Sequence, residues 1–72
     1  MSHAKALLQK AVDVAGSQSK LAEALGISQQ GVSYYLNQAE QVSAELAIAI
    51  DKFTNGQIKR SELRPDLFGD AA

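Results

Sequence analysis

Residues that could catalyse a reaction are few in this sequence, and their spacing supports no active site. The chain has no cysteine and one histidine, His3, so it offers neither a thiolate nucleophile nor a histidine-based metal cluster. Residues 26–31 have the glycine spacing of a phosphate-binding loop, but Val32-Ser33 follows where lysine and serine or threonine are required. We therefore predict a protein without catalytic residues, cofactor or bound metal.

Uncharged polar side chains recur over residues 29–37, and side chains of this kind can form hydrogen bonds with the edges of DNA bases. A glutamine amide pairs with the N6 and N7 edge of adenine, a serine hydroxyl donates or accepts, and a tyrosine packs against a thymine methyl. The candidates for contacting DNA bases are Gln29, Gln30, Ser33 and Tyr34. Residues 29, 33 and 37 are spaced at i, i+4 and i+8, so on a helix they share one line. The other interpretation is an ordinary solvated surface.

Contacts to the DNA phosphates are predicted on both sides of these residues. A helix that begins at Gln18 presents backbone N–H groups and polar side chains to an anion. The candidates are Gln18, Ser19 and Lys20 on one side, and Asn37 and Gln38 on the other.

These side chains must be positioned by helices, because apolar residues recur along the chain at helical spacing. We expect an all-α fold of four to five helices, held by one core as a single domain over residues 1–72. The predicted elements are helices over about 4–15, 18–25, 29–37 and 44–53, a polar connection at 38–41, a short element near 59–63 and an irregular tail over 65–72.

The second and third predicted helices form a recognisable pair. Ser17 and Ser28 stand at the two N-cap positions, and Gly26 permits a sharp turn between the helices, with Ile27 as an apolar residue within it. Two short helices joined by such a turn describe a helix-turn-helix, whose second helix enters the DNA major groove.

The chain lacks the excess of basic residues that is typical of a protein that binds nucleic acid. The 72 residues carry seven basic and eight acidic side chains, a formal net charge of −1. Residues 1–37 hold three lysines against two acids (+1), and the remainder holds four basic against six acidic residues (−2). We expect few phosphate contacts, a shallow salt dependence and dimerisation to reach a useful affinity. The lack of cysteine and of a membrane-spanning apolar run predicts a cytoplasmic protein with no membrane partner.

Ile48 is the candidate for the dimer contact. It lies off the apolar stripe of the predicted fourth helix, where a solvated helix would carry a polar residue. The alternative is that Ile48 packs within the same chain, against Leu67 and Phe68 as the tail folds back.

Several segments together resemble the Cro-like repressors of prophages, especially the YdaS-type group, whose members are described as antitoxins. The resemblance covers about residues 6–68, and the C-terminal motif is its more specific part. The segments that carry it are Gly16–Ala22, Leu25–Gln30, Val32-Ser33, Leu36-Asn37 and Glu62–Phe68. One departure is Tyr34, where members of the group often have lysine or arginine.

The resemblance implies a lambda-repressor-like fold and a transcriptional repressor that binds double-stranded operator DNA as a homodimer. It also implies that the positions of Gln29, Gln30, Ser33 and Tyr34 contact bases. The alternative function is an antitoxin that binds a partner toxin protein through its acidic C-terminal half and regulates its own operon.

Overall fold

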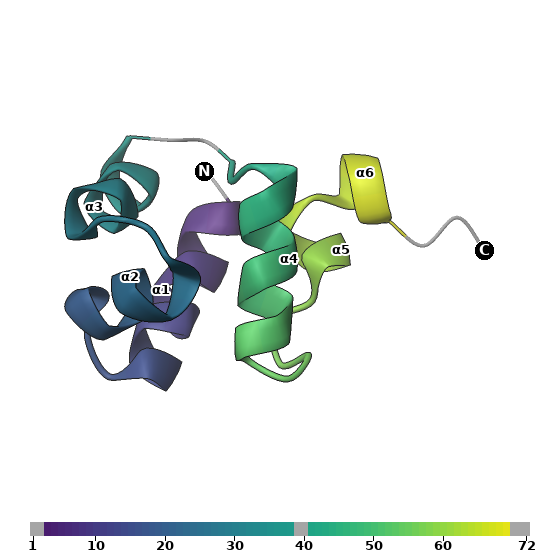
Figure 1. Cartoon of the computed structure of the whole chain (residues 1–72). Coiled ribbons are helices and arrows are strands. Elements are labelled where there is room, and N and C mark those ends of the chain that lie inside the picture. Colours follow the sequence, from purple (N-terminus) through teal and green to yellow (C-terminus); the bar gives the residue numbers. More distant parts are fainter. Residues whose placement is uncertain (1–2, 39–40, 70–72) are drawn as a thin grey trace.

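The computed structural model describes residues 3–38 and 41–69; the predicted connection at Ala39-Glu40 and the tail residues 70–72 lie outside these ranges. Every regular element of the described residues is a helix, so the all-α expectation is confirmed, with one helix more than predicted (Figure 1). The helices are α1 (His3–Ala15), α2 (Gln18–Leu25), α3 (Gln29–Asn37), α4 (Ala44–Phe53), α5 (Arg60–Leu63) and α6 (Pro65–Phe68).

Three serines cap the starts of three helices, two of them, Ser17 and Ser28, at the positions that the sequence predicts. The hydroxyl oxygen of Ser17 accepts a hydrogen bond from the backbone N–H of Lys20 at 3.1 Å, which caps α2. Ser28 caps α3 in the same way at 3.0 Å, and Ser43 caps α4 at 3.1 Å. Each cap pairs one of the backbone N–H groups that a helix start leaves without a partner.

The turn between α2 and α3 depends on Gly26. Its φ of 72° is left-handed, a conformation that glycine adopts without the steric cost of a side chain. The Ile27 N–H donates to the Ala22 carbonyl at 3.0 Å, which closes the turn, and the Ile27 side chain packs against the core. The chain therefore reverses from α2 into α3 within three residues, as a helix-turn-helix requires.

One cluster of buried side chains joins the first five helices. Helix α1 packs against α2, α3 and α5, and α4 packs against α2 and α5. The cluster consists of Leu7, Leu8, Ala11, Val12, Leu21, Ala22, Val32, Leu36, Val42, Leu46, Ala47, Ile50, Ile58 and Leu63. None of the described helices is long and apolar enough to cross a membrane.

The prediction of an irregular tail is wrong for Pro65–Phe68, which form α6. Proline at the first helical position has the required φ, and its missing N–H would have no intrahelical partner there. Arg64 fixes the start of this helix. Its guanidinium binds both carboxylate oxygens of Asp66 at 2.9 and 2.7 Å and donates to the Val42 carbonyl at 2.9 Å. The pKa of the Asp66 carboxyl lies below its usual range because of these bonds.

A second arginine joins α5 to α4. The backbone N–H of Arg60 donates to Asp51 Oδ2 at 3.0 Å, and its guanidinium Nε donates to the same oxygen at 3.1 Å. Both hydrogen bonds from Arg60 hold the pKa of the Asp51 carboxyl below its usual range, and the backbone bond has the larger effect. The guanidinium also lies 5.9 Å from the centre of the Phe68 ring, so one side chain ties together α4, α5 and α6.

Candidate nucleic-acid interface

Helix α3 presents the predicted base-contacting residues on its outer side. Val32 and Leu36 are buried against the core, whereas Gln29, Gln30 and Tyr34 are exposed. Because Ser28 caps the helix directly before Gln29, the backbone of this first turn is held in place. Ser33, the fourth predicted residue, is half-buried on the same helix. The structure thus brings the four candidates together on one short helix.

Tyr34 and Tyr35 divide between the two sides of α3. Their ring centres lie 5.4 Å apart, with the planes inclined at 72°. The Tyr34 side chain is 52% exposed, and Tyr35 is half-buried and packs against the core. This edge-to-face contact gives the exposed tyrosine a fixed neighbour. Only Tyr34 is therefore placed to meet a molecule lying along the outer side of α3.

The predicted phosphate contacts lie at the start of α2 and the end of α3. Ser19 and Lys20 are exposed and Gln18 is half-buried in the first turn of α2, where backbone N–H groups of a helix start point outward. The Lys20 side chain lies beside Gly16, whose φ of 106° is a conformation that favours glycine. A Cβ atom at Gly16 would lie 3.6 Å from the Lys20 Cδ and 3.9 Å from its Nζ.

At the other end, Gln38 is exposed and Asn37 is engaged within its own helix. The Asn37 side-chain amide nitrogen donates to the Ser33 carbonyl oxygen at 2.9 Å and to the Ser33 hydroxyl at 3.1 Å. The sequence indicates that these two side chains can meet, because residues 33 and 37 lie about one helical turn apart on the same face of a helix. The direction of the bond follows only from the structure.

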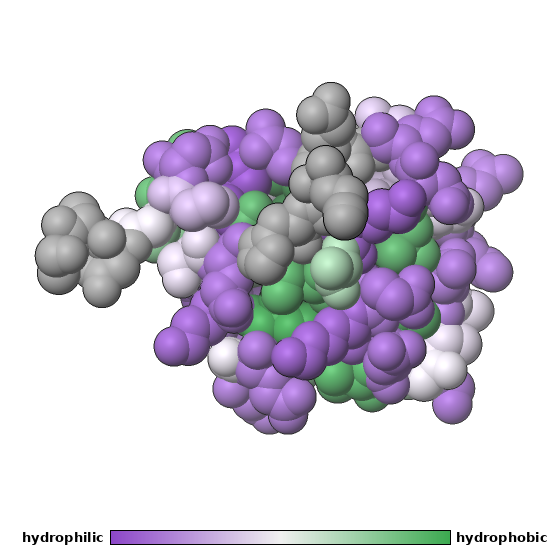
Figure 2. Space-filling view, turned by 180° about the vertical axis from the view of Figure 1, so that it is seen from behind, coloured by the Kyte–Doolittle hydropathy of each residue, from purple (hydrophilic) through white to green (hydrophobic). Residues whose placement is uncertain are grey.

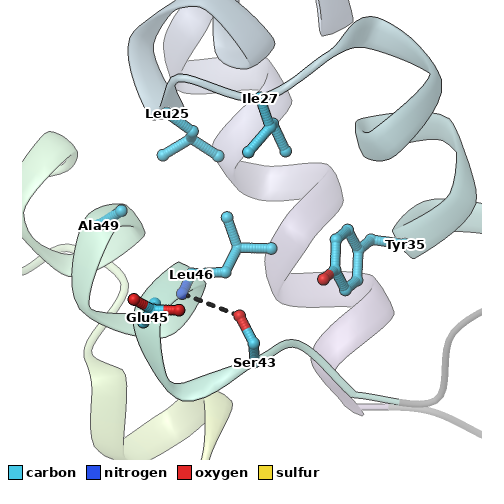
Figure 3. A pocket seen from close by; sticks show the side chains of 7 residues that line it. All are labelled: Leu25, Ile27, Tyr35, Ser43, Glu45, Leu46 and Ala49. Atoms are coloured by element: carbon cyan, nitrogen blue, oxygen red, sulfur yellow. Dashed lines mark hydrogen bonds between the residues drawn. The ribbon is translucent and has the colours of Figure 1, made fainter.

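A shallow pocket of about 270 Å³ lies between the helix-turn-helix and the start of α4. Leu25 and Ile27 form one side, Tyr35 another, and Leu46 and Ala49 the side contributed by α4 (Figure 3). Ser43 and Glu45 are the polar residues on its edge, and the dashed line in the figure is the Ser43 cap. The pocket is mostly apolar, and the residue that α3 contributes to its lining is Tyr35.

Few large hydrophobic side chains are exposed elsewhere. The face opposite to that of Figure 1 is mostly hydrophilic, with hydrophobic side chains gathered near its middle (Figure 2). Among the described residues, the exposed large hydrophobics besides Tyr34 are Val14 at 43% and Leu67 at 53%. Ile48 is half-buried on α4. Of its two predicted packing partners in the tail, Phe68 packs against the core and Leu67 does not.

Comparison with known proteins identifies the family. Residues 8–72 match the family model described as "Bacterial toxin YdaS". The chain belongs to the YdaS family. The family description names a toxin, whereas the alternative function inferred from the sequence is that of an antitoxin, the other member of such a pair.

A curated member of this family is similar over most of the chain. The Escherichia coli (strain K12) protein named "Putative transcriptional regulator YdaS" is 37% identical over 59 residues. The match covers 82% of this chain and 60% of that relative. This chain therefore spans less than two thirds of the relative's length. The resemblance to the YdaS group stated from the sequence is thereby confirmed.

The fold matches a solved structure of a prophage protein. The protein is "the Cro protein from putative prophage element Xfaso 1 in Xylella fastidiosa strain Ann-1", with a TM-score of 0.80 and 39% identity. The match covers 89% of this chain and 97% of that one. The YdaS-family chain described here is therefore Cro-like in its fold as well as in its sequence motifs.

Proposed function

We propose that this chain is a sequence-specific regulator of transcription that binds operator DNA through the outer side of α3. The observation that carries the proposal is the exposure of Gln29, Gln30 and Tyr34 on a helix whose first turn is fixed by a serine cap. Uncharged amides and a phenol hydroxyl at the start of a recognition helix are suited to base edges in the major groove. The similarity to a transcriptional regulator and to a Cro protein supports the same function.

In this proposal the remaining predicted residues position the protein on the duplex. The first turn of α2, with Gln18, Ser19 and Lys20, faces one phosphate strand, and Gln38 faces the phosphates beyond the end of α3. Two copies of the chain bind the two halves of an operator in the cytoplasm and repress transcription by excluding polymerase. No step of this function requires a cofactor or a catalytic residue.

The test is the triple variant Gln29→Ala, Gln30→Ala, Tyr34→Ala. We expect it to fold normally and to lose selective binding to operator sequences chosen by the wild-type protein from a random DNA pool. Each base contact contributes about 1–3 kcal/mol, so the loss in affinity should exceed tenfold. Unchanged affinity and selectivity in the triple variant would show that α3 does not contact the bases.

A matched control carries three alanine substitutions of exposed polar residues on other elements. This control should bind the operator as the wild type does, because its changes lie outside α2 and α3. The substitutions are Gln9→Ala, Lys52→Ala and Gln57→Ala.

We assign the dimer contact to the region around Ile48. It is a half-buried aliphatic residue on α4, a helix that lies outside the helix-turn-helix, so a dimer formed there leaves both recognition helices accessible. Ile48→Asp should shift sedimentation of the protein bound to its operator from two copies towards one. An unchanged two-copy complex would place the contact elsewhere.

A second candidate function follows from the description of the family as a toxin. If the chain arrests growth when it is expressed, the triple α3 variant separates two causes. Arrest that disappears in the variant would arise from DNA binding, and arrest that persists would arise from another surface or from a partner protein bound by residues 39–72.

A further inference from the structure

The hydrogen bonds between Asn37 and Ser33 determine which way the Asn37 amide faces. Its nitrogen lies 2.9 Å from the Ser33 carbonyl oxygen and 3.1 Å from the Ser33 hydroxyl oxygen. A backbone carbonyl can only accept, so the amide group beside it must be the NH₂ and not the oxygen. The usual ambiguity between the two ends of an asparagine amide is therefore removed at this position.

The same contact determines how the Ser33 hydroxyl is used. A hydroxyl has one proton to donate and two lone pairs that accept. Asn37 donates to one of the lone pairs, and within the described residues no acceptor takes the hydroxyl proton. A donor bonded to the oxygen also polarises the O–H group and makes it a better donor. Ser33 thus presents a proton on the helix that carries Gln29, Gln30 and Tyr34.

We propose that Asn37 is a positioning residue that sets base specificity by making Ser33 a hydrogen-bond donor to the operator. A donor at this position recognises a base that offers an acceptor in the major groove, namely guanine, adenine N7 or thymine O4. Cytosine presents only its amino group there, which would have to share the Ser33 oxygen with the Asn37 NH₂ group, so cytosine is disfavoured. The inference rests on the proposed function and assigns to one residue pair the choice of base at one position.

This role differs from the phosphate contact that the sequence suggests for Asn37. With the amide nitrogen directed at Ser33, the outer end of the side chain is the carbonyl oxygen Oδ1. A phosphate oxygen is also an acceptor, so these two groups do not hydrogen-bond. The neighbouring Gln38 is exposed, and the described structure gives its side-chain amide no hydrogen bond, so it remains available to a phosphate.

The test compares base preferences in sequences selected from a random DNA pool by four proteins: the wild type, Ser33→Ala, Asn37→Ala and Asn37→Asp. Ser33→Ala identifies the base pair concerned, where discrimination should fall by about two- to tenfold, the range for one hydrogen bond. Asn37→Ala should relax the same base pair and no other. Asn37→Asp can only accept from Ser33, so the hydroxyl oxygen then faces the DNA and the preference should move to cytosine or adenine, whose amino groups donate.

Gln38→Ala is the matched control, because a phosphate contact lowers affinity for all sequences alike and leaves base preference unchanged. The inference is overturned if Asn37→Ala keeps the wild-type preference at the Ser33 base pair, or weakens binding uniformly as Gln38→Ala does. Failure of the wild-type protein to select any sequence overturns the proposed function, and this inference with it. Circular dichroism on each variant confirms that the helices are retained.

Discussion

At the scale of single residues, Thr54 illustrates how one buried hydroxyl holds a helix end in place. Its side chain is 2% exposed, donates to the Ile50 carbonyl at 2.8 Å and accepts from the Ile58 N–H at 3.1 Å. Ile58 is fully buried, and this hydroxyl is the acceptor that the structure gives its N–H group. Thr54 thus connects the end of α4 to the segment that leads into α5.

Thr54→Val should therefore destabilise the protein by about 1–3 kcal/mol, because it leaves the buried Ile58 N–H without an acceptor while keeping the shape of the side chain. Urea unfolding measures the loss. Thr54→Ser is the control, since it keeps the hydroxyl and should cost only about 0.8 kcal/mol for the missing methyl group. Equal stabilities of wild type and the valine variant would show that this hydrogen bond contributes nothing.

The sequence predicts individual side chains well where a local rule decides their contacts. Ser17 and Ser28 cap helices as predicted, and Ser43 caps α4 in the same way, because a cap depends only on the next three residues. The hydroxyl of Thr54 and the guanidinium of Arg64 bind backbone groups whose positions depend on how whole helices pack, so no local pattern reveals them. The assigned base and phosphate contacts remain predictions, since they require the DNA.

At the scale of elements, Gly26 in the turn between α2 and α3 and Gly31 within α3 have different reasons to be glycine. Gly26 has a φ of 72°, and a Cβ atom there would have no neighbour within 4 Å. Its constraint is therefore the backbone conformation. Gly31 is helical, and a Cβ there would lie 3.4 Å from the Ser28 Oγ and 3.6 Å from the Ile27 Cδ1, within ordinary contact distance. The missing side chain at Gly31 would point into the turn and not outward from α3.

The same substitution at these positions should have opposite effects. Gly31→Ala should stabilise the protein by a few tenths of a kcal/mol up to about 1 kcal/mol, because alanine restricts the unfolded chain and fits the helix. Gly26→Ala should destabilise it by about 1–2 kcal/mol through the left-handed backbone. Thermal unfolding of both variants tests the comparison, and destabilisation by Gly31→Ala would mean that the turn around Ser28 cannot take an added methyl group.

The elements themselves are largely predictable from the sequence, and α6 shows where the prediction fails. The helices α1 to α4 follow apolar spacing and serine or glycine signals, so their bounds agree with the structure within a residue or two. Helix α6 has four residues, too few for a periodic pattern, and it is held by Arg64 against Asp66 and the Val42 carbonyl. The contact between Arg64 and Val42 joins residues 22 positions apart, so the residues next to Pro65 give no indication of it.

At the scale of the whole molecule, the low net charge of the chain and the lack of charged side chains on α3 bear together on the proposed DNA binding. The chain has a formal charge of −1, and the predicted DNA contacts include one cation, Lys20. The remaining predicted contacts are amides, hydroxyls and backbone N–H groups, which bind DNA without releasing counterions. If the proposed function holds, selectivity should therefore rest on hydrogen bonds to bases, and the proposed dimer should supply the affinity that electrostatic attraction does not.

This balance predicts an unusually weak dependence of operator binding on salt. A dimer with one lysine per copy at the phosphates neutralises about two phosphates, and the plot of log K against log salt concentration should have a slope near −2. Lys20→Gln should flatten that slope by about one unit per copy. Lys59→Gln, at the start of α5, should leave it unchanged. Filter binding or fluorescence anisotropy at several salt concentrations gives the slopes. A wild-type slope steeper than about −5 would require several further cations at the interface and would refute recognition by mainly uncharged groups.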